Sequence, residues 1–241
     1  MKNNVYPVIT KKYSKNIWRK YIKCIEEYKL LKDGDIIFVP VNTNEYSFTN
    51  ECLCKMLLTM SSEFKMYDIK VVAGEDFSMI DKYNCNKIVA PDDFEDIADN
   101  TLWEMLYNGR ISSFLPKERI KFKDGLSIIR PLYLIHREDI LACYKDIPVA
   151  MNGTSFEEPT DILQNTLSDT FSDSLPDSGK RKELAYVRSI IDRLSVNNEA
   201  VGNNVFGSVV NVDADMLPAY RIADKKHEFL EWYDCKNRSC Q

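Results

Sequence analysis

Apolar residues recur along this chain with two different spacings. Between residues 16 and 31 they return every three or four positions, at Ile17, Trp18, Tyr21, Ile22, Ile25 and Tyr28. This spacing predicts an amphipathic helix that carries its lysines on the other face. The apolar runs at 36–41, 69–73, 87–90 and 126–132 are short and continuous, which is typical of buried strands.

Helical segments alternate with these strands. We expect helices at 49–62, in a short stretch between the second and third strands, at 93–108 and at 136–145. In the third of these, the inward-facing residues should be Ile97, Leu102, Met105 and Leu106. The alternation predicts an α/β fold, with a Rossmann-like, short and mostly parallel sheet flanked by helices.

The second half of the chain differs in character. Residues 152–178 are rich in Ser, Thr, Asp and Pro, which favours a loop, whereas 180–194 and 197–210 predict helices. We therefore expect three parts: an α/β domain at 1–151, an acidic insertion at 152–179, and a C-terminal helical region with a tail at 180–241.

Charge and cysteine content narrow the class of protein. The formal net charge is −5, yet no Asp or Glu occurs before Glu26, so the N-terminal segment is basic. A basic arm is compatible with a nucleic-acid partner, and equally with a solvated helix face. Seven cysteines in 241 residues do not suggest a secreted disulfide framework. With no apolar run of signal-peptide or membrane-spanning length, we expect a cytoplasmic protein with reduced thiols and no membrane contact.

Several segments, taken in order, resemble one known family. The first strand is followed by the polar loop 42–47 and a helix. Residues 107–117 read YNGRISSFLPK, residues 128–132 read IIRPL, residues 137–140 read REDI, and residues 205–212 read VFGSVVNV. These segments are similar to those of the tRNA 2-thiocytidine synthetases, in the N-type ATP pyrophosphatase (PP-loop) superfamily. The resemblance extends over about 17–216.

The resemblance implies a Rossmann-like fold and a particular reaction. Members of that family adenylate a cytidine of tRNA with ATP and Mg²⁺ and replace its oxygen with sulfur. They hold an iron–sulfur cluster on three cysteines, a CxxC pair and one further cysteine downstream.

The predicted nucleotide loop departs from the family pattern SGGxDS. Its residues are Asn42, Thr43, Asn44, Glu45, Tyr46 and Ser47. Side chains stand where glycines would let the backbone wrap a phosphate, and Glu45 places a negative charge there. Only Ser47 matches. We expect no ATP binding in the manner of the family.

The second nucleotide segment of the family aligns with an acidic run in this chain. Asp92, Asp93, Glu95 and Asp96 stand where typical members have HHxDD. Clustered carboxylates could hold Mg²⁺. Alternatively, they are acidic residues in the first turn of a helix, where they complement its dipole. We favour the second interpretation.

The cysteines match the family least. No CxxC pair occurs, and residues 147–153, where the downstream cysteine is expected, contain none. We therefore expect no iron–sulfur cluster. Cys24, Cys85 and Cys143 are predicted to be core residues. Cys52 and Cys54 should point to different faces of one helix, and Cys235 and Cys240 with His227 could bind zinc. We expect His136 to lie at a helix start.

A basic segment could contact RNA phosphates, with Phe114 as an exposed aromatic beside it. The candidate residues are Arg110, Lys117, Arg119, Lys121, Lys123 and Arg130. For Arg110 and Arg130 the sequence leaves open a structural role as partners of carboxylates inside the fold.

The favoured hypothesis is a degenerate family member that acts as a scaffold or as an RNA- or partner-binding subunit without bound cofactor. Its partners would be tRNA or another RNA, and it could form a homodimer, or a heterodimer with an active relative. The alternative is a divergent tRNA sulfurtransferase that depends on ATP and Mg²⁺, with the metal on Asp92, Asp93, Glu95 and Asp96.

Overall fold

The computed structural model describes residues 2–41, 48–120, 123–147, 178–212, 217, 219–222 and 225–228. The chain forms two compact units, Met1–Phe206 and Gly207–Gln241. Within the described residues no helix is long and apolar enough to cross a bilayer.

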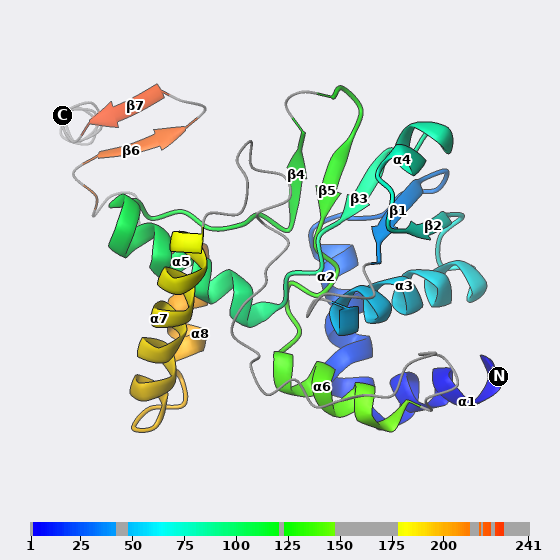
Figure 1. Ribbon diagram of the computed structural model, residues 1–241, viewed down its shortest axis with the longest axis horizontal. Helices are drawn as coiled ribbons and strands as arrows, with labels where there is room; N and C mark the ends of the chain where they lie inside the picture. The colour runs from blue at the N-terminus through cyan, green and yellow to red at the C-terminus, as the bar shows by residue number, and fades with distance from the viewer. Residues whose placement is uncertain are drawn as a thin grey trace, which may run out of the picture. The chain divides into compact units, whose positions relative to one another are not determined.

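The first unit is built around a five-stranded sheet with the order β2-β1-β3-β5-β4 (Figure 1). Its strands are β1 (Ile36–Pro40), β2 (Lys70–Gly74), β3 (Lys87–Val89), β4 (Lys117–Arg119) and β5 (Ser127–Ile129). Adjacent strands are parallel except β4, which runs antiparallel to β5. The prediction of a mostly parallel α/β fold is confirmed.

Helices join and cover the strands. They are α1 (Lys2–Pro7), α2 (Arg19–Glu27), α3 (Phe48–Glu63), α4 (Ser78–Lys82), α5 (Phe94–Asn108), α6 (Arg137–Asp146), α7 (Ser178–Ser195) and α8 (Val201–Val210). Two π-helical turns, η1 (Val8–Lys12) and η2 (Ser14–Trp18), lie between α1 and α2. The hydrophobic spacing predicted most of these elements within a few residues. It did not predict β4, α1 or the π turns, because short charged strands and wide turns leave no periodic signal.

Alternation along β1 divides the core between the two faces of the sheet. Ile37 and Val39 of β1 belong to one cluster with α2, α3 and α6, whereas Phe38 belongs to a second cluster that includes Ile80 of α4. Successive side chains of a strand point to opposite faces, so each face needs its own helices. This arrangement explains why the strands read as continuous apolar runs.

The two amphipathic-helix predictions have different outcomes. In the α2 segment the expected inner face is confirmed, with Tyr21 and Ile25 buried. On α5, Ile97 is buried, but Met105 and Leu106 are 42% and 56% exposed. That part of the prediction is wrong. The fully buried residues of α5 end at Thr101; Leu102 and Trp103 still pack against the cluster with α7, whereas Met105 and Leu106 in the last turn do not.

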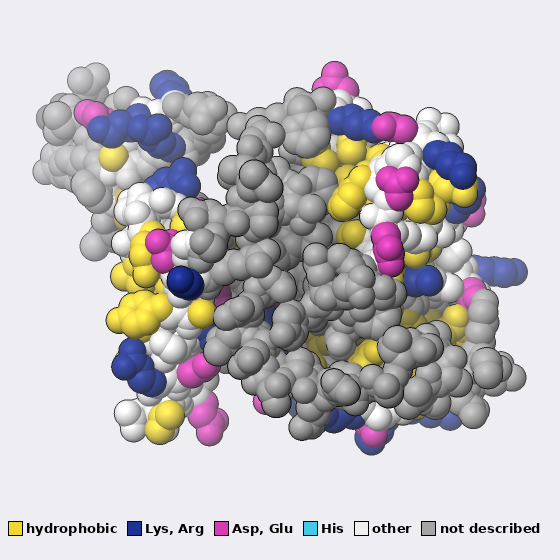
Figure 2. Space-filling model, in the orientation of Figure 1, with side chains coloured by type: hydrophobic (Ala, Val, Ile, Leu, Met, Phe, Trp, Pro, Cys, Tyr) yellow, Lys and Arg dark blue, Asp and Glu magenta, His cyan; other side chains and the backbone are white. Residues whose placement is uncertain are grey.

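Helix α7 packs on α5 inside the first unit. Val187 and Ile191 of α7 form a small cluster with Ala98 of α5. On its outer side Tyr186 and Leu194 are 56% and 54% exposed, and Figure 2 shows hydrophobic side chains over this helix. The predicted boundaries at 151 and 179 lie in, or next to, residues outside the described ranges, so that three-part division stays a prediction.

The second unit contains an antiparallel hairpin of β6 (Ala219–Ile222) and β7 (Lys225–Glu228). Tyr220 stacks on His227, with ring centroids 5.2 Å apart. Cys235 and Cys240, the other predicted zinc ligands, lie outside the described residues.

A buried ion pair joins the amino ends of the two central strands. The Lys87 ammonium of β3 pairs with Asp35 and donates to the Leu30 carbonyl oxygen at 2.6 Å. Asp35 also accepts from the Lys32 backbone N–H at 2.6 Å and from the Asn86 amide at 2.9 Å. Both charged side chains are about 95% buried, so each depends on the other for a partner.

We predict that Lys87→Met lowers the free energy of unfolding by about 3–5 kcal/mol, because it leaves Asp35 charged, buried and without its cation. The double variant Lys87→Met/Asp35→Asn should recover part of this loss, because no charge is then stranded. Urea unfolding of the two single variants and the double variant measures the coupling. Strictly additive effects would contradict the pairing.

Candidate functional site

The acidic run lies at the carboxyl edge of the sheet. Asp92 and Asp93 follow β3 at the point where the strand order reverses between β1 and β3, which is where open α/β sheets bind ligands. Asn50, in the first turn of α3, donates its amide to the Pro91 carbonyl oxygen at 3.0 Å and to Asp93 at 3.3 Å. The loop 42–47, predicted to be the nucleotide loop, would follow β1 at this edge and lies outside the described residues.

Asp93 and Asp96 form a capping box at the start of α5. The Asp93 carboxylate accepts from the backbone N–H of Asp96, and the Asp96 carboxylate accepts from the backbone N–H of Asp93, both at 3.0 Å. Two N–H groups without helical partners are satisfied in this way. The interpretation of the acidic run as a helix start is confirmed.

Arg137, the first residue of α6, neutralises this cap. Its guanidinium donates from Nε and from one terminal nitrogen to the two carboxylate oxygens of Asp93, each at 2.8 Å, and it also pairs with Asp96. Asp93 is fully buried. A bidentate pair of this kind fixes orientation as well as charge, and here it fixes the start of α6 against the start of α5.

Arg130 pairs with the first carboxylate of the run. Its Nε donates to Asp92 at 2.7 Å, and a terminal nitrogen donates to Glu118 of β4 and to the Leu115 carbonyl oxygen, both at 2.6 Å. Its guanidinium also lies 4.7 Å from the ring centre of Phe114. Arg130 is 4% exposed and Phe114 is half-buried, so of the two roles predicted for Arg130 the structure bears out the structural one.

The remaining acids of this region are also engaged. Glu95 accepts from the Arg137 backbone N–H at 2.7 Å and lies 2.8 Å from His136 Nδ1. Asp99, one turn further along α5, accepts from Arg188 Nε of α7 at 2.9 Å. His136 lies at the N-cap position of α6, as predicted, although its side chain makes no capping bond. We call Asp92, Asp93, Asp96 and Asp99 with Arg130, Arg137 and Arg188 the aspartate–arginine ladder.

The carboxyls of the ladder do not titrate alike. Burial raises the pKa of Asp96 well above its usual range, and the nearby Asp93 and Asp92 charges add to that rise despite the opposing effect of Arg137. Burial likewise raises the pKa of Asp92 and of Asp99. For Asp93, burial is overcome by the Arg137 guanidinium, which lowers its pKa. Two carboxyls share one arginine, so one stays ionised while the other favours its proton.

The carboxylates of the ladder are engaged by arginine side chains. Among the residues that the structure describes, no three His, Cys, Asp or Glu side chains gather as metal ligands. Mg²⁺ would have to displace Arg130 or Arg137 from carboxylates that these arginines already neutralise. The roles of Arg137 and Arg188 were not predicted from the sequence because their partners are far away in the chain. Arg137 does belong to the REDI segment at 137–140, which carried part of the resemblance.

The other basic candidates are dispersed. Arg110 pairs with Glu104 of α5 at 2.8 Å, Lys117 donates to the Lys29 carbonyl oxygen at 3.2 Å, and Lys123 pairs with Asp81 of α4. Arg119 on β4 is exposed. Lys121 lies outside the described residues.

The described cysteines are mostly core residues, as predicted. Cys24, Cys54, Cys85 and Cys143 are buried, and Cys52 is half-buried on a different face of α3 from Cys54. Burial raises the pKa of Cys24 and of Cys143 to about 12 and that of Cys52 to about 11. These thiols are therefore poor nucleophiles near neutral pH.

Comparison with known proteins gives a likeness of fold. No family model matches the chain, and no curated protein matches it. Among solved structures, the U34-tRNA thiolase NcsA from Methanococcus maripaludis with its [4Fe-4S] cluster is similar, with a TM-score of 0.45 and 10% identity over 82% of this chain and 80% of that one.

The expectation that no iron–sulfur cluster is present is corrected by that comparison. The similar structure is a thiolase that carries a [4Fe-4S] cluster, and this chain contains seven cysteines. The five described cysteines do not gather as cluster ligands, and Cys235 and Cys240 are outside the described residues.

We predict that Arg137→Ala lowers the free energy of unfolding by about 3–5 kcal/mol, because Asp93 would be left buried without its cation. Arg110→Ala is the matched control. It removes an arginine–glutamate pair in which the arginine side chain is 65% exposed, and it should cost no more than about 1 kcal/mol. Denaturant unfolding compares the two, and equal losses would contradict a structural role for the ladder.

The raised pKa values predict a pH dependence. A carboxyl whose pKa is higher in the folded state binds more protons there, so the free energy of unfolding should fall as pH rises above about 3.9, the ordinary aspartate pKa. The lowered pKa of Asp93 affects the free energy of unfolding only at pH values below about 3.9. Asp96→Asn should make the free energy of unfolding fall less steeply with rising pH. Asp124→Asn, a change at an exposed residue, should leave this pH dependence as it is in the wild type. Urea unfolding from acidic to neutral pH measures both slopes, and identical slopes would contradict the assignment.

Proposed function

We propose that this protein is a degenerate relative of the tRNA 2-thiocytidine synthetases within the PP-loop superfamily, and that it acts as a scaffold or partner-binding subunit. The observation that carries the proposal is the state of the acidic run. Each of its carboxylates already has a partner: Asp92 has Arg130, Asp93 and Asp96 have Arg137, and Glu95 has the Arg137 backbone and His136.

These contacts join elements instead of exposing reactive groups. Arg130 ties β5 to β4 through Glu118, Arg137 ties α6 to α5, and Arg188 ties α7 to α5. In an ATP-dependent enzyme the carboxylates at this edge would have to be available to a metal ion. Here their release would leave buried guanidinium groups without partners, at a cost of several kcal/mol. The ladder therefore supports a structural role for the segment.

The sequence of the loop after β1 supports the same conclusion. Its sequence includes the acidic Glu45, which would repel an anionic phosphate, and has Thr43 and Asn44 in place of the glycines that the family uses there. RNA association through Arg119, Lys117 and their neighbours stays a prediction.

Calorimetry with ATP and Mg²⁺ tests the proposal. We expect no saturable heat from the wild-type protein, because neither the loop nor the acidic run offers a phosphate or metal site. The Ser47→Ala variant, which changes the only loop residue that matches the family, should behave identically. Micromolar binding that requires Mg²⁺ and is lost in Ser47→Ala would overturn the proposal in favour of the divergent sulfurtransferase, as would ATP–pyrophosphate exchange with the same dependence.

A further inference from the structure

A surface groove runs along the outer side of α2 and the π turn that precedes it. It has a volume of about 710 Å³, and the described residues that line it are Ser14, Trp18, Arg19, Ile22, Lys23, Glu26 and Glu27. All seven belong to one continuous helical segment, η2 followed by α2. Nothing in the proposed function involves this groove.

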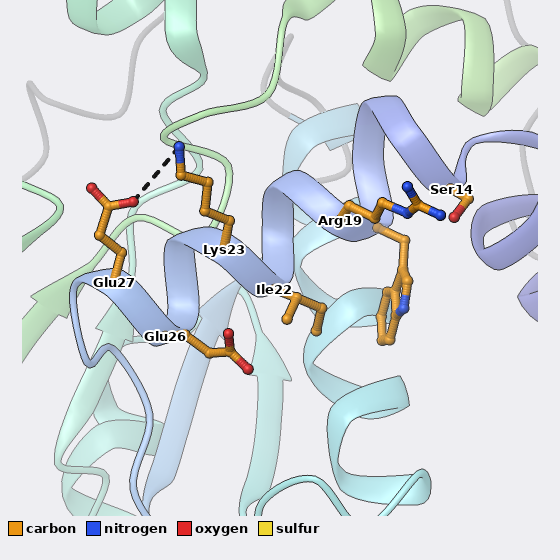
Figure 3. Close-up of a pocket in the computed structure, with 7 residues that line it drawn as sticks. Ser14, Arg19, Ile22, Lys23, Glu26 and Glu27 are labelled. Atoms are coloured by element: carbon orange, nitrogen blue, oxygen red, sulfur yellow. Dashed lines mark ion pairs between the residues drawn. The ribbon is translucent and has the colours of Figure 1, made fainter.

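The lining residues form two rows at four-residue spacing. One row contains Ser14, Trp18, Ile22 and Glu26, and the other contains Arg19, Lys23 and Glu27. Figure 3 shows Ile22 and Glu26 on one side of the helix, with Lys23 and Glu27 on the other and an ion pair between the latter two. Rows of this spacing are the ridges of a helix surface, and the space between two such ridges accepts a ridge of another helix.

The middle of one row is apolar. Trp18 and Ile22 are only partly buried against the core. Trp18 meets Phe64, just beyond α3, edge to face with ring centroids 5.8 Å apart, and Phe64 is itself 46% exposed. Aromatic and aliphatic side chains that remain accessible beside a groove gain free energy when a partner covers them.

The charges along the groove are antisymmetric. Arg19 and Lys23 occupy its amino-terminal half, and Glu26 and Glu27 its carboxyl-terminal half. Arg19 and Glu27 are eight residues apart, about 12 Å along the helix axis. A second α2 that crosses in the opposite direction would place its glutamates beside Arg19 and Lys23, and its own cations beside Glu26 and Glu27.

We propose that α2 is the contact helix of a homodimer in which two copies of this chain pack their grooves together about a two-fold axis, with the helices antiparallel. The self-complementary charge order favours a second copy over the other partners that a groove could take. A nucleic acid would meet Glu26 and Glu27, which repel phosphate. Helices whose ridges are of this type cross at about 50°, so the charged ends stay within reach of long side chains.

Charge reversal with complementation tests the dimer. Arg19→Glu/Lys23→Glu makes the groove wholly negative, and Glu26→Lys/Glu27→Lys makes it wholly positive. Each double variant alone should be monomeric at concentrations where the wild type is a dimer, with the dimer Kd raised at least about tenfold. An equimolar mixture of the two should form a heterodimer, because a negative groove then meets a positive one.

Analytical ultracentrifugation over a concentration series measures the oligomeric state of the wild type, of each double variant and of their mixture. Lys15→Glu is the matched control. Lys15 is exposed on η2 but does not line the groove, so its reversal should leave the dimer intact. Circular dichroism checks that each variant is folded, and heterodimer formation in the mixture shows this independently. A monomeric wild type, a dimer that survives both double variants, or a mixture that stays monomeric would each overturn the proposal. ATP binding bears on the proposed function alone and leaves this test unaffected.

Discussion

The buried charge on Asp93 is the constraint on which the arrangement of the first unit depends. A fully buried carboxylate needs a cation, and Arg137 supplies it through Nε and one terminal nitrogen. Because Asp93 also caps α5, the same contact sets where α5 begins and where α6 begins. Arg130 and Arg188 form similar pairs with Asp92 and Asp99. Ion pairs of this kind therefore connect the end of β5, the start of α6 and the middle of α7 to α5 or to the residue just before its cap.

This use of charge bears directly on function. The carboxyl edge of a parallel sheet is the usual ligand-binding position, since loops and helix starts converge there. In this chain the described part of that edge contains ion pairs that hold the fold together. Removing a ligand-binding role from such residues does not free them to change, because each buried arginine would then lose its partner.

The outer surface of the first unit follows a different principle. Where α2 faces the sheet, Tyr21 and Ile25 are buried, whereas at the edge of that face Trp18 and Ile22 are only half-buried, beside the charged row of Arg19, Lys23 and Glu27. The apolar stripe of this helix is therefore wider than the part that the core covers. The groove on α2 is therefore consistent with assembly, and its antisymmetric charges favour a second copy of the same helix as the partner.

The sequence by itself determined the class of fold. Hydrophobic spacing is a local property, so it predicted β1, β2, β3, β5 and the helices between them. The acidic residues after β3 indicated the start of a helix. Tertiary structure alone decided what those acids do, because Asp93 and Arg137 are far apart in the chain and only the packing of α6 on α5 brings them together. It also decided that Arg130 is buried while Met105 and Leu106 are exposed. Residue type and periodicity cannot report such facts, since burial depends on which element covers a given face.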